Sequence, residues 1–105
     1  MRKSLGLALE GEPNVQLSIK TDAPILYWLI FDSNFDVVEK GDAANPKPFR
    51  LPVGDYLCEM KFGPAARDMT ASMTIVTNCP SSPYEVHGEI SNKPTATIDR
   101  SFSVC

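Results

Sequence analysis

Apolar side chains recur at every second position in the middle of the chain, and this pattern limits the fold more than any other feature. After a turn at Pro52, Val53 and Gly54, the apolar positions that define the pattern are Tyr56, Cys58, Met60 and Phe62. Successive side chains of a β-strand point to opposite faces of the sheet. The stretch therefore predicts a strand with one apolar face and one mostly solvated face.

The same period of two recurs along the chain and predicts further strands at residues 5–9, 15–19, 37–39, 49–51 and 69–75. Residues 25–31 are apolar at every position and too short for a typical helix. We expect them to form a central strand covered on both faces, followed by a hairpin turn at 32–36. The nine prolines lie mostly between these segments, which favours short strands joined by turns. The predicted fold is an all-β, antiparallel β-sandwich.

Alternation resumes after a polar connector at residues 78–83 and predicts a C-terminal β-hairpin over residues 84–104. About seven strands precede it, so we expect one domain, residues 1–105, with a core at 4–77 and a surplus hairpin. An exposed hairpin carries unpaired backbone groups. It would either pair with a protein partner or another copy by strand addition, or pair with the first strand and complete a larger sandwich.

Residues 15–77 resemble an Ig-like or fibronectin-type-III-like sandwich. Trp28 lies where strand C would be, and a turn followed by Tyr56, two residues before a Cys, is similar to the tyrosine corner of strand F. The run Phe-x-Leu-Pro-x-Gly-x-Tyr from Phe49 also resembles a turn of prealbumin-like modules. The chain lacks the second Cys of the Ig inter-sheet disulfide, and Pro52 replaces the usual Asp. The resemblance implies a module that binds proteins or sugars, or acts as a spacer.

Charge and hydropathy exclude two classes of partner. The net charge is −3 and the bases form no run, whereas nucleic-acid binding requires a basic patch. No segment approaches the roughly 20 apolar residues of a membrane span. The N-terminal apolar stretch ends at Leu9, without the length or cleavage site of a signal peptide. We expect synthesis in the cytoplasm without a recognisable signal, from where the protein could enter a virion or another particle.

The chain has three cysteines, and no two of them have C-x-x-C spacing. Cys58 falls on the apolar face of its strand, so we interpret it as a small buried hydrophobe. Cys79 and Cys105 fall near a loop and the terminus, where a disulfide is geometrically possible. A reducing compartment favours free thiols at both positions.

Two groups of side chains contain oxygen or nitrogen atoms at spacings that could suit a metal. Asp32, Asn34 and Asp36 match the start of a calcium loop, but its later Gly and Glu are absent, and Asp and Asn also favour tight turns. Glu85 and Glu89 flank His87 on one strand face, where charged residues are usually solvated. No nucleophile motif is present. We therefore predict no catalytic residue, metal or cofactor.

Aromatic side chains supply the candidate contact surface. Tyr27 and Trp28 lie within an apolar run and are expected in the core, whereas Phe35 and Phe49 are expected to be exposed. With the hairpin, the predicted partner-binding residues are Phe35, Phe49, Tyr84, Ile98 and Phe102. The expected function is that of a non-enzymatic structural or interaction protein in a larger assembly, such as a virion or phage decoration or tail component. The alternative is a carbohydrate- or ligand-binding module; a small hydrolase would require a pocket with His87 and a carboxylate.

Overall fold

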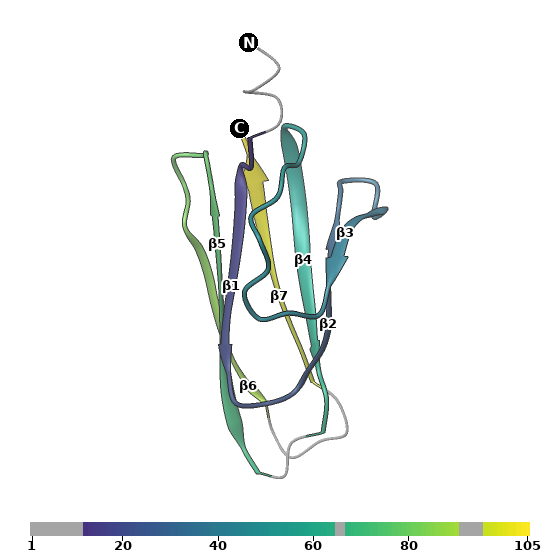
Figure 1. Ribbon diagram of the computed structural model, residues 1–105, viewed down its shortest axis with the longest axis vertical. Helices are drawn as coiled ribbons and strands as arrows, with labels where there is room; N and C mark the ends of the chain where they lie inside the picture. Colours follow the sequence, from purple (N-terminus) through teal and green to yellow (C-terminus); the bar gives the residue numbers. More distant parts are fainter. Residues whose placement is uncertain (1–11, 65–66, 91–95) are drawn as a thin grey trace.

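The computed structural model describes residues 12–64, 67–90 and 96–105, and this part of the chain forms seven antiparallel strands in two sheets (Figure 1). Sheet A contains, in spatial order, β1 (Val15–Thr21), β5 (Met69–Thr77) and β6 (Tyr84–Ile90). Sheet B contains β3 (Val37–Gly41), β2 (Ile25–Phe31), β4 (Gly54–Phe62) and β7 (Ala96–Val104). The predicted all-β class is confirmed.

The alternation of side chains places one face of each sheet in a shared core. Sheet A contributes Val15, Leu17, Ile19, Ala71, Met73, Ile75, Tyr84 and Ile90, and sheet B contributes Trp28, Ile30, Tyr56, Cys58, Met60, Phe62, Ile98, Phe102 and Val104. The indole of Trp28 lies against the backbone of Gly41, where a β-carbon would come within 2.4 Å of the ring. The missing side chain at Gly41 therefore makes room for the largest residue of the core.

Two sides of the sandwich are closed in different ways. On one side, β6 and β7 contact each other, and Gly88 permits this approach because a β-carbon there would lie 2.4 Å from Ile98. On the other side, the loop between β3 and β4 covers the edge of β1, with a bridge between Val15 and Phe49. Within the described residues, β3 is left as the uncovered edge strand, at the right of Figure 1.

The last two strands are not a hairpin, so that expectation is wrong. β6 pairs with β5 in sheet A, whereas β7 pairs with β4 in sheet B. In the described part of the chain, which begins at residue 12, five strands are formed up to residue 77, and β6 and β7 complete the two sheets. This outcome is nearer to the alternative of a larger sandwich, although the partners are β4 and β5 in place of the first strand. Alternation shows which side chains face inward but not which strand lies alongside.

Other predicted strands have mixed outcomes. The segment at 49–51 makes a single bridge to β1 in place of a strand. The predicted strand at 5–9 and the turn at 91–94 lie outside the described residues. The turn before β4 has the geometry of a tyrosine corner, because the Tyr56 hydroxyl donates a 2.5 Å hydrogen bond to the carbonyl of Pro52.

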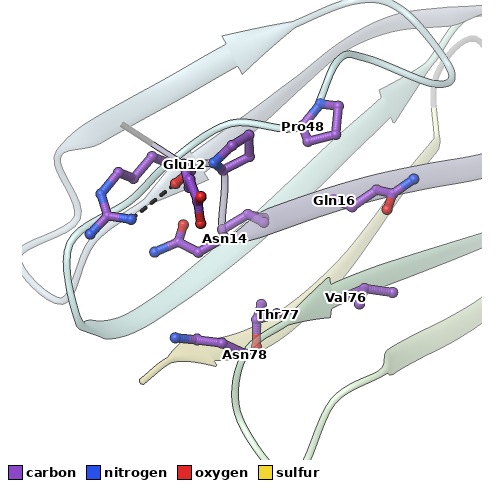
Figure 2. Close-up of a pocket in the computed structure, with 10 residues that line it drawn as sticks. Glu12, Asn14, Gln16, Pro48, Val76, Thr77 and Asn78 are labelled. Carbon is purple, nitrogen blue, oxygen red and sulfur yellow. Dashed lines mark hydrogen bonds between the residues drawn. The ribbon is translucent and has the colours of Figure 1, made fainter. Parts of the chain in front are cut away.

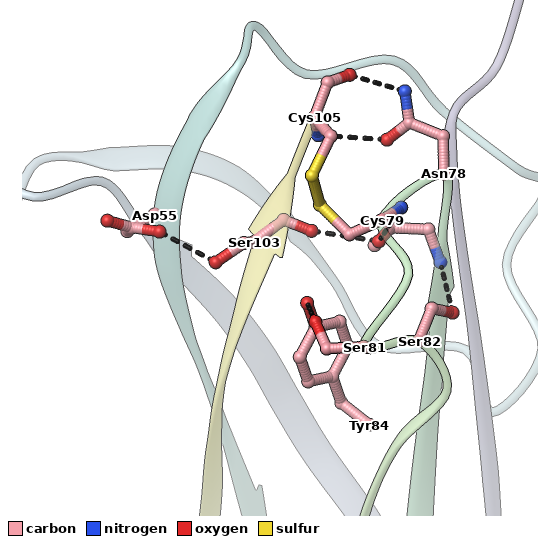
Figure 3. The surroundings of a disulfide bond; sticks show 9 residues. Asp55, Asn78, Cys79, Ser81, Ser82, Tyr84, Ser103 and Cys105 are labelled. Atoms are coloured by element: carbon pink, nitrogen blue, oxygen red, sulfur yellow. Dashed lines mark hydrogen bonds between the residues drawn. A yellow bond between two sulfur atoms is a disulfide. The ribbon is translucent and has the colours of Figure 1, made fainter.

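A disulfide joins Cys79 and Cys105, whose α-carbons are 5.1 Å apart, so the expectation of free thiols is wrong (Figure 3). It connects the end of β5 in sheet A to the end of β7 in sheet B. Asn78 reinforces the link, because its side-chain oxygen accepts a 2.9 Å hydrogen bond from the Cys105 amide and its side-chain nitrogen donates to the Cys105 carbonyl. The prediction failed because it rested on an assumed reducing compartment and not on the positions of the two cysteines, which already allowed a disulfide.

Candidate functional site

The structure places most of the predicted partner-binding residues in or against the core. Tyr84, Ile98 and Phe102 are buried, and Phe102 packs between the rings of Tyr84 and Tyr56 at centroid distances of 6.2 and 5.5 Å. Phe49, expected to be exposed, is half-buried and stacks on Trp28 at 6.0 Å. These side chains are therefore not available to a partner. Only Phe35, 74% exposed, has the predicted accessibility.

Phe35 lies in the β2–β3 turn, which is organised by Asp32. One carboxylate oxygen of Asp32 accepts hydrogen bonds from the amides of Asn34 (2.9 Å) and Asp36 (3.0 Å). This bonding confirms the interpretation of these residues as a tight turn. Phe35 has a φ of 63°, a left-handed conformation that is uncommon for a bulky residue. The turn thus holds an aromatic side chain in solvent at the free end of the hairpin.

The outward side of β2 is partly exposed, so the prediction that this strand is covered on both faces is wrong. Trp28 and Ile30 point inward and are buried, whereas Tyr27, Leu29 and Phe31 point outward and are only partly buried. The expectation of a core position therefore holds for Trp28 and fails for Tyr27. Because every residue from 25 to 31 is apolar, the two sides of the strand look alike in the sequence. The sequence also does not show which segment, if any, covers each side.

The outer face of sheet B is an apolar stripe with charged residues on both sides. We define it by the outward residues of three strands: Val37 and Lys40 of β3, Tyr27, Leu29 and Phe31 of β2, and Leu57, Glu59 and Lys61 of β4. The strand register arranges them in rows across the sheet: Val37–Phe31–Leu57, Lys40–Leu29–Glu59, and Tyr27–Lys61. In the last row the Lys61 ammonium lies 6.0 Å from the Tyr27 ring centre.

A hollow of about 600 Å³ opens on this face between β2 and β3. It is lined by Leu26, Tyr27, Leu29, Lys40, Gly41 and Asp42. Leu26 is 46% exposed, and Asp42 adds a negative charge on the β3 side next to Tyr27. The Tyr27 row therefore has a carboxylate on its β3 side and the Lys61 ammonium on its β4 side.

The outer face of sheet A is polar by contrast. Apart from Val76, its outward residues are Gln16, Ser18, Lys20, Thr70, Ser72, Thr74, Glu85, His87 and Glu89. Glu85, His87 and Glu89 share this face as predicted, and His87 lies opposite Ser72. Among the described residues no group of three or more His, Cys, Asp and Glu side chains is placed to share a metal ion.

Cys58 lies in the core and has no thiolate character at neutral pH. Burial raises the pKa of its thiol to about 12, and the nearby charge of Glu59 adds to this effect. Its sulfur contacts the Met73 sulfur at 3.7 Å. A protonated, buried thiol is a poor nucleophile, so this residue acts as a packing group.

A second hollow, of about 450 Å³, lies at the start of β1 (Figure 2). Two of its polar residues, Asn14 and Arg50, hold the loop before β4. Asn14 forms two 2.9 Å hydrogen bonds with the backbone of Leu51, and Arg50 donates a 2.9 Å bond to the carbonyl of Glu12. These contacts hold residues 12–14, just before β1, against the loop that precedes β4.

A scan against protein-family models matches no family, and searches of curated proteins and of solved structures return no significant match.

No helix in the described part of the chain has the length and apolarity that a membrane crossing requires.

Proposed function

We propose that the protein is a non-enzymatic structural or interaction protein in a larger assembly, and that it makes its contacts through the outer face of sheet B. One observation carries this proposal: β2 presents Tyr27, Leu29 and Phe31 together on a face that no described segment covers. A contiguous apolar patch with a polar rim is typical of a protein–protein interface. The outer face of sheet A, built from the same kind of strands, has no such stripe.

The disulfide supports a setting outside the reducing cytoplasm. The Cys79–Cys105 bond is of the kind that persists in extracellular proteins and on virion or cell surfaces. A virion, or a phage decoration or tail, would use a small module of this kind in many copies. We therefore propose such a particle as the setting, reached after synthesis in the cytoplasm.

An Ig-like relationship belongs to the same proposal. The tyrosine corner at Tyr56 supports it, as does the pairing of the Trp28 strand with the Tyr56 strand in one sheet. The connectivity differs from an Ig domain, because β5 and β6 of sheet A come between β4 and β7 in the sequence, whereas the corresponding Ig strands F and G are consecutive. The likeness therefore concerns a local motif and a layer arrangement.

The test is site-specific photo-crosslinking in the native host. A photoreactive amino acid replaces Leu29 on the outer face of sheet B, and a matched variant carries it at Ser72 on the outer face of sheet A. We expect a covalent protein adduct from position 29 and none from position 72. Equal adducts at both positions, or none at position 29, would refute a dedicated protein-binding face on sheet B.

The hollow beside Tyr27 favours one alternative function, a carbohydrate- or ligand-binding module. A sugar can stack on a partly exposed aromatic ring while charged groups at the rim, here Lys40 and Asp42, bind its hydroxyls. A glycan array separates the two functions: specific binding that is lost in Tyr27→Ala would favour the module. No binding to any glycan would leave the protein–protein function.

A further inference from the structure

We infer that the outer face of sheet B binds the same face of a second copy of this chain. The two copies would be related by a two-fold axis that lies between the two sheets and runs parallel to β2. The inference rests on the proposed function and names its partner. A two-fold interface is self-complementary, so each feature on one side of the axis must match the feature on the other side. The strand register of sheet B meets this requirement in three successive rows.

The apolar residues lie on or close to the proposed axis. Rotation about this axis brings Leu29 against Leu29 of the second copy, and likewise Phe31 against Phe31 and Tyr27 against Tyr27. It also exchanges the two flanking strands, so that Val37 on β3 meets Leu57 on β4 of the other copy. The stripe thus becomes a dry centre. Two sheets packed face to face commonly cross at about 30°, which suits a two-fold axis along their strands.

The charges match under the same rotation. Leu29 has Lys40 on its β3 side and Glu59 on its β4 side, so each Lys40 meets a Glu59 of the second copy. Asp42 lies beside Tyr27 on the β3 side and Lys61 lies on the β4 side, so each Asp42 meets a Lys61. Four opposite-charge contacts therefore surround the stripe. Such charges contribute mainly to the orientation of the complex and to its rate of formation.

Pairing through the free edge of β3 fits less well. Two β3 strands related by a two-fold axis would pair antiparallel, with a residue at the centre opposite its own copy. The centre of β3 is Glu39 followed by Lys40, so either choice places like charges opposite each other, which is destabilising. The register of β3 also shifts between its partners Ile30 and Phe31, and such a bulge hinders edge pairing.

The size of the face sets the expected affinity. Three facing strands about 4.8 Å apart and about 25–30 Å long give a footprint of roughly 400 Å² per copy, or about 800 Å² in total, because β7 projects beyond β3 of the second copy. This area is below that of most stable specific interfaces and is typical of a transient one. We therefore expect a weak, reversible dimer whose fraction rises with concentration, as for a complex with a dissociation constant of roughly 10–100 µM.

Charge reversal tests the inference by sedimentation equilibrium of the full chain from about 1 µM to about 1 mM, a range that brackets the expected affinity. Lys40→Glu replaces both Lys40–Glu59 contacts by like charges, and Glu59→Lys does the same with the opposite sign. Each variant should dimerise about tenfold more weakly or worse. Lys20→Glu, on the outer face of sheet A, is the matched control and should dimerise like the wild type.

Restoration is the decisive result. A one-to-one mixture of Lys40→Glu and Glu59→Lys chains has opposite charges at both contacts, so a mixed dimer should form with nearly wild-type affinity. The double variant that carries both changes should dimerise with itself for the same reason. Circular dichroism and melting temperature close to those of the wild type would show that the exposed substitutions leave each fold intact.

Three results would overturn the inference: a wild-type chain that stays monomeric at about 1 mM, a dimer insensitive to both single variants, or no restoration in the mixture. These results are separable from failure of the proposed function. A crosslink from position 29 to a different protein would preserve protein–protein contact on this face while refuting the second copy as its partner. No crosslink and no dimer would refute both.

Discussion

The two outer faces of the sandwich are built from the same backbone geometry and carry opposite kinds of side chain. Apart from Val76, sheet A presents polar or charged residues to solvent on all three of its strands. Sheet B presents tyrosine, leucine and phenylalanine along β2, with charges on the neighbouring strands. Both inner faces fill the same core. The difference shows that the apolarity of β2 exceeds what closing the sandwich requires.

Substitutions on the two sides of β2 should show the largest difference between its buried and its outward residues. Ile30→Ala removes a fully buried side chain and should lower the free energy of unfolding by about 2–5 kcal/mol. Leu29→Ala removes a partly exposed side chain of the same size and should cost less than about 1 kcal/mol in the monomer. Urea unfolding at low protein concentration measures both. Equal losses would show that the outer face of sheet B is structural core.

Removal of the disulfide is a second test, because this bond connects the two sheets at their ends and lies on neither outer face. The double variant Cys79→Ser, Cys105→Ser opens a loop of 26 residues and should lower the free energy of unfolding by about 3.5 kcal/mol in the chain-entropy treatment. Dimerisation of the molecules that remain folded should be unchanged. Wild-type protein in reducing agent is the control and should unfold at the same urea concentration. A folded variant that no longer dimerises would show that the disulfide shapes the outer face of sheet B.

The smallest expected effect concerns the core between the faces. The folded state raises the pKa of Cys58 from 9.0 to about 12, so it favours the neutral thiol. The neutral Cys58 thiol makes its full contribution to the free energy of unfolding below about pH 9. This contribution is lost as the pH rises towards 12, by about 1.4 kcal/mol per pH unit. Cys58→Ala should therefore show a shallower loss of stability than the wild type when unfolding is measured from about pH 8 to 10.5. Parallel slopes would assign alkaline destabilisation to groups outside the core.

Much of the fold could be predicted from residue alternation alone. The period of two at Tyr56, Cys58, Met60 and Phe62 indicates a strand with a buried face, and these side chains are buried. Asp32 indicates the tight turn between β2 and β3 because its carboxylate can bond to nearby amides. Both signals are local. They depend on the geometry of one strand or one turn, which a short stretch of sequence determines.

The failures concern relations between distant segments. Alternation at residues 84–104 is the same whether the two strands pair with each other or lie in opposite sheets, so the hairpin could not be distinguished from the observed arrangement. The exposed side of β2 was missed because a continuous apolar run does not reveal which of its sides is covered. The Cys79–Cys105 bond depends on β5 and β7 ending side by side, which no local pattern reports.

The position of the disulfide also determines how the molecule would respond to mechanical tension. The first residue of β1, Val15, pairs with Thr77 at the end of β5, and Cys79 follows two residues later. A pull between Val15 and Cys105 would pass through the disulfide to that same end of the β1–β5 ladder. The load would therefore open the ladder one hydrogen bond at a time, in the manner of a zipper, with no shear across the whole strand. Such a module would begin to unfold at low force, while β6 and β7 stay protected within the covalent loop. It would therefore suit a position that bears little tension better than one in series with a mechanical load.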